Sequence, residues 1–379
     1  MGLSLIKKVA VVIGTRPEAI KMAPVILKLK SSKEIKVKVI STGQHRELLD
    51  QVIQLFDFKV DFSLNIMESN QSLAGITSKV VTKLDDVFRK EDFDLILVHG
   101  DTTTAMGASL AAFYNKIKVA HVEAGLRTND IYAPFPEEIN RKLIASIAFR
   151  NYSPTLSSKN NLLDENITES KILITGNTVI DALFYILDQI KRNKIEINPE
   201  IRNLVSNKKK SYLLVTGHRR ENFGEGFLSI CSALKHLAQN NPNLTIIYPV
   251  HLNPNVKEIV HHHLNDLENV QLIEPLDYSS FVYLMAEASI ILTDSGGVQE
   301  EAPSLGIPVL VMREKTERPE AVESGTVKIV GTNKELIIQE VETLLSDKDY
   351  YKSMSEKLNP YGDGNAADRI LDDILKLDF

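Results

Sequence analysis

Short apolar runs alternate with longer segments of helical hydrophobic spacing along the whole chain. This alternation predicts repeated strand–helix–strand units, and therefore an α/β fold with parallel sheets. The predicted strands of the first half are Val9–Ile13, Val37–Ser41, Leu95–Val98, Val119–Val122 and Ile172–Ile174. Those of the second half are Tyr212–Thr216, Thr245–Val250, Val270–Leu272, Ile290–Thr293 and Val309–Val311.

The strand pattern restarts after a polar stretch from Lys191 to Ser211. A chain of 379 residues suits two domains better than one core. We therefore expect two doubly wound, Rossmann-like domains, at residues 1–175 and 176–364, with a hinge near Gly176. The tail at residues 365–379 has apolar residues at helical spacing, and a helix alone would be unstable, so we expect it to pack back on the first domain.

Composition narrows the class of protein. The single cysteine, Cys231, excludes an internal disulfide framework and favours the reducing cytoplasm. The apolar run Val9–Ile13 is too short for a signal-peptide core or a membrane span, so no membrane partner is expected. A net charge of −6 argues against a nucleic-acid partner. An anionic ligand would then need a local cluster of basic groups.

Ionisable side chains follow several of the predicted strands, where ligands bind in open parallel sheets. The strings that follow a strand are Gly14-Thr15-Arg16-Pro17-Glu18, His99-Gly100-Asp101, Glu123-Ala124-Gly125, Gly217-His218-Arg219-Arg220, His251 and Asp294-Ser295-Gly296-Gly297. They come from both halves, so we expect a cleft between two domains that holds a ligand of two parts.

Two of these strings suit an anion. Thr15 and Glu18 have the spacing of a capping box, which places Arg16 in the first turn of a helix and Lys21 one turn later; both cations could instead be surface charges. Small side chains and backbone N–H groups at Ser295-Gly296-Gly297 would admit a phosphate, although an unliganded tight turn fits as well. In the following helix Glu301 could accept from ribose hydroxyls or compensate the helix dipole.

The carboxylates Asp101, Glu123 and Glu137 suit proton transfer at a sugar carbon, unless they are structural groups bound to backbone amides. His218, next to Arg219 and Arg220, lies where a diphosphate leaving group would need positive charge.

Motifs for the common cofactors are missing from the sequence. No Gly-x-Gly-x-x-Gly fingerprint, Walker loop or His-Glu-x-x-His motif is present, so neither a dinucleotide cofactor nor a metal site is expected. Three successive histidines, His261–His263, face different directions on a helix and are interpreted as a solvated face.

Five long strings carry a specific resemblance: Gly14-Thr15-Arg16-Pro17-Glu18-Ala19-Ile20-Lys21-Met22, His99-Gly100-Asp101-Thr102-Thr103-Thr104, His121-Val122-Glu123-Ala124-Gly125-Leu126-Arg127-Thr128, Gly217-His218-Arg219-Arg220-Glu221-Asn222 and Asp294-Ser295-Gly296-Gly297-Val298-Gln299-Glu300-Glu301-Ala302-Pro303. They resemble the motifs of the non-hydrolysing bacterial UDP-N-acetylglucosamine 2-epimerases. The resemblance continues through Thr316-Glu317-Arg318-Pro319-Glu320-Ala321 to Tyr361-Gly362-Asp363-Gly364-Asn365-Ala366. It implies a GT-B-like pair of domains, a homodimer, and interconversion of UDP-GlcNAc and UDP-ManNAc for surface polysaccharide synthesis.

The resemblance also implies site residues. Those that would contact the nucleotide sugar are Arg16, Lys21, Asp101, Glu123, His218, Phe281, Ser295, Gly296, Gly297, Glu301 and Arg318, with Leu276 at a ligand position that is often Gln in the family. The catalytic set would be Asp101, Glu123, Glu137 and His218, with individual roles unassigned. Because the acetamido group acidifies the C2 proton little, we expect removal of that proton to be coupled to departure of UDP from C1. This step gives a 2-acetamidoglucal, and UDP then adds to the glucal again.

A second, activating substrate site of some members would involve Gln44, His45 and Gln71 here, but the residue that pairs with Gln71 is Asn70 where those members have Arg. Three other functions stay open from the residues alone: a retaining glycosyltransferase of the same architecture, a hydrolysing epimerase that releases UDP and N-acetylmannosamine, and a non-catalytic nucleotide-sugar sensor.

Overall fold

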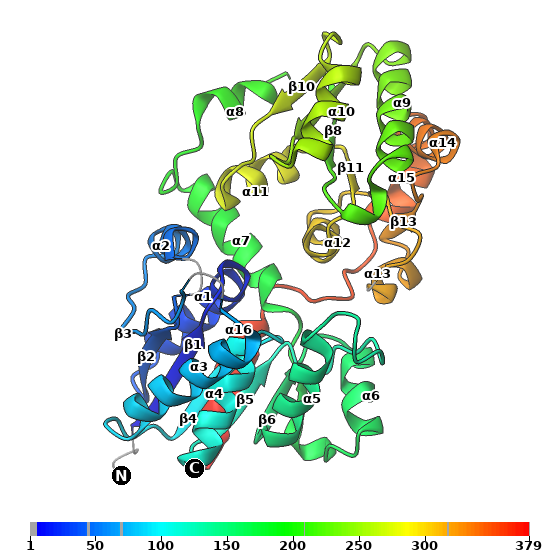
Figure 1. The fold of residues 1–379 in the computed structure, drawn as a ribbon. Helices are drawn as coiled ribbons and strands as arrows, with labels where there is room; N and C mark the ends of the chain where they lie inside the picture. The colour runs from blue at the N-terminus through cyan, green and yellow to red at the C-terminus, as the bar shows by residue number, and fades with distance from the viewer. Residues whose placement is uncertain (1–5, 44–45, 69–70, 208, 317, 379) are drawn as a thin grey trace. The chain divides into compact units, whose positions relative to one another are not determined.

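The computed structural model describes residues 6–43, 46–68, 71–207, 209–316 and 318–378. The chain forms two compact units (Figure 1), Met1–Ala182 with Tyr361–Phe379 and Leu183–Pro360. The division falls within α7 (Thr178–Lys191), a few residues beyond the expected hinge near Gly176. Each unit contains one parallel sheet with helices packed on it, which confirms the α/β prediction.

The sheet of the first unit has the strand order β3-β2-β1-β4-β5-β6-β7, with every neighbouring pair parallel. Its described strands are β1 (Lys7–Ile13), β2 (Ile35–Ser41), β3 (Phe62–Ser63), β4 (Leu95–His99), β5 (Lys118–Val122), β6 (Arg150–Ser153) and β7 (Ile172–Ile174). Its described helices are α1 (Arg16–Ser31), α2 (Arg46–Leu55), α3 (Leu73–Phe88), α4 (Thr103–Tyr114), α5 (Glu137–Ile147), α6 (Leu156–Asp164), the start of α7, and α16 (Ala366–Lys376). Helices α3, α4 and α5 pack in sequence on one face, while α1 and α16 pack together on the other (Figure 1). Strands β1, β4 and β5 occupy the middle of this doubly wound sheet.

The sheet of the second unit has the order β10-β9-β8-β11-β12-β13, again with parallel neighbours. Its described strands are β8 (Ser211–Thr216), β9 (Leu244–Pro249), β10 (Val270–Ile273), β11 (Ile290–Thr293), β12 (Val309–Val311) and β13 (Val327–Ile329). Its described helices are α8 (Pro199–Leu204), α9 (Glu225–Asn240), α10 (Pro254–Leu264), α11 (Tyr278–Glu287), α12 (Gly296–Glu301), α13 (Pro319–Glu323), α14 (Lys334–Ser346) and α15 (Lys348–Ser355).

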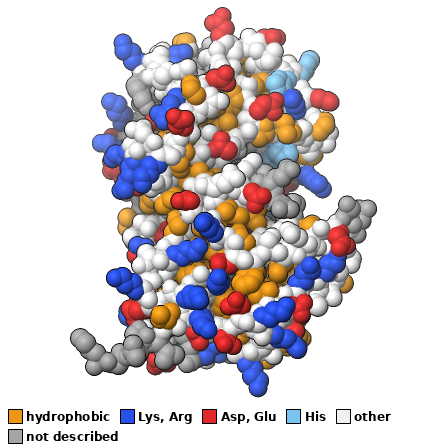
Figure 2. Space-filling view, turned by 90° about the vertical axis from the view of Figure 1, so that its left-hand side faces the viewer, with side chains coloured by type: hydrophobic (Ala, Val, Ile, Leu, Met, Phe, Trp, Pro, Cys, Tyr) orange, Lys and Arg blue, Asp and Glu red, His pale blue; other side chains and the backbone are white. Residues whose placement is uncertain are grey.

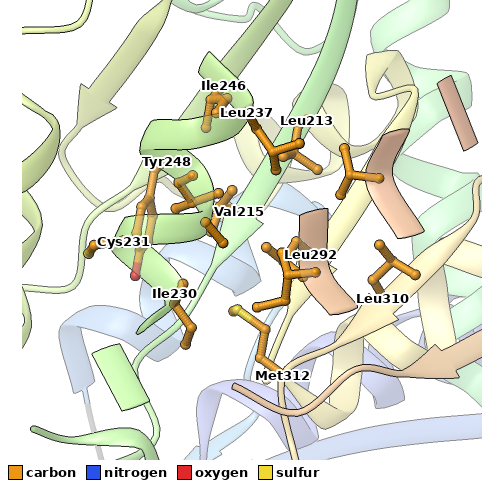
Figure 3. Close-up of a cluster of buried hydrophobic side chains, with 14 of the residues drawn as sticks. Leu213, Val215, Ile230, Cys231, Leu237, Ile246, Tyr248, Leu292, Leu310 and Met312 are labelled. Atoms are coloured by element: carbon orange, nitrogen blue, oxygen red, sulfur yellow. The ribbon is translucent and has the colours of Figure 1, made fainter. Parts of the chain in front are cut away.

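The core of the second unit lies between α9 and its sheet (Figure 3). Helix α9 contributes Ile230 and Leu237, which face apolar side chains of the central strands such as Leu213 and Leu292. Cys231 is fully buried in this cluster, and its burial raises the pKa of the thiol to about 12. The sulfur is therefore a packing group rather than a nucleophile.

The C-terminal helix α16 is fastened to the first unit at both ends. At its N-terminus the carboxylate of Asp181 accepts from the backbone N–H groups of Ala366 and Ala367, at 3.2 and 2.8 Å. At its C-terminus Lys7 Nζ donates to the carbonyls of Ile374, Leu375 and Leu377 at 2.6–2.8 Å. Both ends of the helix thus have partners for groups that a helix leaves unsatisfied.

Three strands were missed by the sequence analysis, namely β3, β6 and β13. The residues of strand β6 all carry polar groups, yet Asn151, Tyr152 and Ser153 are fully buried. Because it contains no aliphatic side chains, this buried strand gave no hydrophobic pattern in the sequence. Helix α8 lies in the polar stretch from Lys191 to Ser211, where no helix was expected; Asn198 caps it and Pro199 begins it.

Among the described residues, no helix is long and apolar enough to cross a membrane. On the face in Figure 2, acidic and basic side chains are interspersed, and the described residues drawn there form no continuous basic surface.

Candidate active site

The polar residues of the first unit come from three neighbouring strands, because β1, β4 and β5 are adjacent in the sheet. Arg16 and Lys21 lie on α1 directly after β1, Asp101 follows β4, and Glu123 follows β5. The carboxyl ends of parallel strands lie at the same edge, so the sheet order brings these four residues to one edge.

The start of α1 is fixed by Glu18. Its buried carboxylate accepts from the backbone N–H groups of Gly14 and Thr15 at 3.0 and 2.6 Å, which confirms the predicted capping box. It also accepts from the hydroxyl of Thr102 at 2.6 Å. Burial raises the pKa of Glu18, while the hydrogen bonds from Thr102, Thr15 and Gly14 oppose that rise. Glu18 thus ties the loop after β1 to the loop after β4.

Glu123 has a left-handed backbone, with φ of 63°, which is rare for a residue with a side chain. One carboxylate oxygen, Oε2, forms an ion pair with Lys21 Nζ and accepts from Asn177 Nδ2 at 2.9 Å. The Nε2 atom of His99 lies 3.8 Å from the same oxygen. The Lys21 and Glu123 side chains are only 14% and 9% exposed, so the pair is little screened by water.

His121 supports the loop that carries Asp101. Its ring is fully buried, and burial lowers its pKa to about 3, so the imidazole is neutral at physiological pH. Since Nε2 lies 2.7 Å from the carbonyl oxygen of Gly100, Nε2 carries the proton and donates it there. This hydrogen bond fixes the residue next to Asp101.

Helix α5 supplies the partners of Asp101. Arg141 Nε donates to Asp101 Oδ2 at 2.9 Å, and Nη2 of the same guanidinium lies 2.7 Å from that oxygen as an ion pair. Asn140 donates to the Asp101 carbonyl at 2.8 Å. The same helix begins at Glu137, whose Oε2 is buried and has no hydrogen-bond partner among the described residues. A buried carboxylate oxygen without a hydrogen bond lowers the stability of the folded protein and is typical of a position that contacts a ligand.

In the second unit, His218 and Asp294 follow the adjacent strands β8 and β11. Asp294 Oδ2 accepts from the backbone N–H groups of His218 and Arg219, both at 2.8 Å. Its Oδ1 lies 3.4 Å from Nδ1 of the His218 ring. The same ring stacks on His251, with centroids 5.4 Å apart and planes 15° apart. The carboxylate is fully buried while the imidazole is about half exposed, so a buried anion orients an accessible ring.

The glycine turn after Asp294 lies beside a cation. Ser295 precedes the short helix α12, and the Arg318 guanidinium lies 3.9 Å from where a Cβ on Gly296 would stand. Nε of Arg318 is paired with the buried Glu300. The Glu301 Oε1 atom lies 3.9 Å from the corresponding point on Gly297. Small residues with an adjacent guanidinium are suited to a phosphate group.

A protein-family sequence model described as UDP-N-acetylglucosamine 2-epimerase matches residues 27–375. The chain belongs to the UDP-N-acetylglucosamine 2-epimerase family. The UDP-N-acetylglucosamine 2-epimerase of Campylobacter jejuni is 53% identical over 376 residues, which cover 98% of each chain. The expected family resemblance is therefore confirmed.

Solved structures of similar proteins agree. A putative UDP-N-acetylglucosamine 2-epimerase from Listeria monocytogenes matches with a TM-score of 0.91 and 45% identity, over 98% of this chain and 96% of that one. The UDP-GlcNAc 2-epimerase from Neisseria meningitidis, solved with UDP-GlcNAc bound, matches with a TM-score of 0.86 and 50% identity, over 98% of this chain and all of that one. The expected GT-B-like class of two Rossmann-like units is confirmed.

The remaining residues expected from the family are distributed as follows. Leu276 lies in the loop before α11 and Phe281 within α11, and both are half-buried. Gln44 and His45 lie outside the described residues. The Gln71 side chain is engaged in its own loop, where it donates to the Ile66 carbonyl at 2.9 Å and accepts from the Glu68 N–H at 3.0 Å.

The structure adds residues that the sequence analysis did not select, namely Glu18 as a link between loops, Asn140, Arg141, Asn177, His121 and Asp294. All but Asn177 lie in or next to the strings that carried the resemblance, or in the segment after Glu137. Their position beside those strings was a usable signal, whereas Asn177 had none. Within the described residues, no group of three or more His, Cys, Asp or Glu side chains is placed to hold a metal ion.

Proposed function

We propose that the protein interconverts UDP-GlcNAc and UDP-ManNAc without net hydrolysis, by elimination and re-addition of UDP. The observation that carries this proposal is the environment of Glu123. Glu123 has a strained backbone, and its carboxylate pairs with Lys21 and accepts a hydrogen bond from Asn177. The residue follows strand β5, next to the loop that carries Asp101. Membership of the epimerase family, and a UDP-GlcNAc-bound relative at 50% identity, support this substrate.

The nucleotide binds on the second unit in this proposal. Ser295, Gly296 and Gly297 receive a phosphate, with Arg318 beside them. Glu301 accepts from ribose hydroxyls, and the base lies near Leu276 and Phe281. The carboxylates of the first unit act on the sugar in this proposal, and Arg16, Lys21 and His218 act on the diphosphate.

The chemical step removes the C2 proton while the C1–O bond to UDP breaks. The C–H electron pair becomes the C1=C2 double bond of a 2-acetamidoglucal, and the C1–O pair leaves with UDP. Re-addition forms the C1–O bond again and returns a proton to the opposite face of C2. Asp101, Glu123 and Glu137 form the acid–base set, and His218 with Arg16 stabilises the free diphosphate.

The chemistry calls for at least two groups, one on each face of C2. Glu123 and Asp101 are assigned to this pair because they are close neighbours: a Cβ on Gly100 would lie 3.7 Å from Glu123 Oε1, and Asp101 is the next residue. Glu137 contributes the buried oxygen Oε2 at the start of α5, the helix that binds Asp101 through Asn140 and Arg141.

The proposal is tested by incubating the purified protein with UDP-GlcNAc, with neither a divalent ion nor NAD added, and following the sugars by NMR. The expected result is an equilibrium mixture of UDP-GlcNAc and UDP-ManNAc. Accumulation of UDP and free N-acetylmannosamine would instead identify a hydrolysing epimerase, and an absence of any manno isomer would contradict the proposal.

We also propose that the protein is a homodimer that uses the exposed apolar side chains of two packed helices, Phe113 and Tyr114 at the end of α4 and Ile139 and Leu143 on α5. A second copy of the chain is the occupant of this surface. Light scattering should give twice the 42.4 kDa chain mass, and a monomeric mass would contradict the dimer.

The cellular setting is a further part of the proposal. A cytoplasmic enzyme with one buried thiol, Cys231, would supply N-acetylmannosamine units for surface polysaccharide. Deletion of the gene should remove these units from the cell surface, and an unchanged surface composition would contradict this role.

A further inference from the structure

Two segments of the first unit are in backbone contact at Gly176–Asn177 and Tyr361–Gly362. The Asn177 N–H donates to the Tyr361 carbonyl at 2.7 Å. A Cβ on Gly176 would lie only 3.3 Å from the Cα of Gly362, and Gly176 has φ of 89°, so a side chain there is disfavoured. One segment leads into α7, which continues into the second unit, and the other is where the chain returns from Pro360.

The side chain of Asn177 joins this crossing point to Glu123. Its Nδ2 donates to Glu123 Oε2 at 2.9 Å, and its Oδ1 accepts from the Val179 N–H at 3.0 Å, within the first turn of α7. Asn177 is only 3% exposed, so water does not compete strongly for these hydrogen bonds. One amide therefore contacts both the first turn of the crossing helix and a proposed catalytic carboxylate.

We propose that Asn177 is a positioning residue, which sets the hydrogen bonding of Glu123 according to the position of the first turn of α7. This inference rests on the proposed function. Glu123 Oε2 has donors on two different supports, Lys21 on α1 and Asn177 at the crossing point. A shift of the first turn of α7 changes the second donor and leaves the first in place. The basicity of Glu123 then depends on the path of the chain between the two units.

Three described groups contribute to the electrostatic surroundings of Glu123. Lys21 pairs with it directly, His99 Nε2 is 3.8 Å from Oε2, and His121 on the preceding strand is neutral because its pKa is lowered to about 3. A change at Asn177 therefore leaves the ion pair between Lys21 and Glu123 in place.

Two substitutions separate positioning from folding. Asn177→Ser keeps an acceptor for the Val179 N–H but is too short to reach Glu123. Asn177→Asp also keeps the acceptor and places a second carboxylate beside Glu123, which disfavours the ionised form of Glu123. The matched control is Asn161→Ser: Asn161 Nδ2 donates at 2.9 Å to the carbonyl of Gly125, two residues beyond Glu123 in the same loop.

The experiment measures kcat and KM for UDP-GlcNAc as functions of pH in all three variants and the wild-type protein, with circular dichroism to verify folding. We expect Asn177→Ser to lower kcat about 10-fold with little change in KM, as for loss of a hydrogen bond to a charged group. Asn177→Asp should lower kcat about 100-fold and move the limb of the kcat profile that reports Glu123 to higher pH, by about one unit. Asn161→Ser should leave the profile where it is.

Two results would overturn the assignment of Asn177. One is an Asn177→Asp profile that superimposes on the wild-type profile after scaling, and the other is an equal displacement in Asn161→Ser. A wild-type protein that forms no UDP-ManNAc would instead overturn the proposed function, and the assignment of Asn177 with it. An active wild-type enzyme with an unmoved Asn177→Asp profile would overturn the assignment of Asn177 alone.

Discussion

The side-chain carboxylate of Asp294 contacts both the backbone and the imidazole ring of His218. One carboxylate oxygen accepts the His218 N–H at 2.8 Å, and the other lies 3.4 Å from Nδ1 of the ring. The imidazole is about half exposed while the carboxylate is completely buried. A buried anion on one side of an imidazole favours a proton at Nδ1 and so fixes the orientation of the ring. We therefore interpret Asp294 as the group that orients the His218 ring.

The first prediction concerns Asp294→Asn. The amide removes the negative charge but is nearly the same size, so we expect kcat to fall about 10- to 100-fold while the protein remains folded. The control is Asp347→Asn in the same unit, because Asp347 also accepts from two backbone N–H groups, of Asp349 and Tyr350, both at 2.9 Å. Equal losses of kcat in the two variants would show that Asp294 acts only through stability.

The second prediction separates binding from chemistry. Arg318→Ala should weaken UDP binding about 10-fold or more in calorimetry, because a charged group beside the glycine turn is lost. Asp101→Asn should leave UDP affinity within about threefold and reduce kcat instead, as for a contact made in the transition state. The control Arg192→Ala removes an exposed arginine just after the end of α7, whose ion pair among the described residues is with Asp188 of that helix. If Asp101→Asn acted as a pure binding variant, its place in the acid–base set would be wrong.

The third prediction follows from the depressed pKa of His121, about 3 in the folded chain against 6.5 for an unperturbed histidine. The folded state binds this proton less readily than the unfolded state. The contribution of neutral His121 to the free energy of unfolding is therefore complete above pH 6.5 and is lost as pH falls toward 3. From neutral pH to about pH 5 the loss should be about 2 kcal/mol of unfolding free energy.

The test for His121 compares urea unfolding of the wild-type protein and His121→Gln at both pH values. Gln can still donate to the Gly100 carbonyl but does not titrate. Between neutral pH and about pH 5, the unfolding free energy of the variant should therefore fall by about 2 kcal/mol less than that of the wild-type protein. The comparison of the two pH differences cancels the opposite contributions of Glu18 and Asp181, whose pKa values are raised by burial. Equal pH differences in the two proteins would refute this account of His121.

The central strands were predictable because they are apolar and buried on both faces. Strand β4 is a run of Leu, Ile and Val that ends at His99, and its apolar run predicts the strand to within one residue. Strand β6 was missed because its buried residues are polar: Tyr152 is held by Asp373 of α16, which is distant in the sequence. Periodicity reports burial by apolar side chains and gives no signal for strands that bury polar ones.

The site shows the same contrast between local and distant contacts. The capping box of Thr15 and Glu18 spans four residues and could be predicted from the sequence. The contact of Asn177 with Glu123 spans 54 positions, and that of Asp294 with His218 spans 76. Such contacts depend on the order of strands in the sheet, which spacing along one sequence does not fix.

The central claim is that inversion at C2 proceeds by elimination and re-addition of UDP. The most direct measurement is turnover of UDP-GlcNAc in deuterated water, followed by NMR of the C2 position in the UDP-ManNAc formed. Because the proton removed from C2 exchanges with solvent before a proton is delivered to the opposite face, the account predicts deuterium at C2 of the product. A manno product that keeps its original C2 hydrogen would contradict elimination and favour a route through transient oxidation.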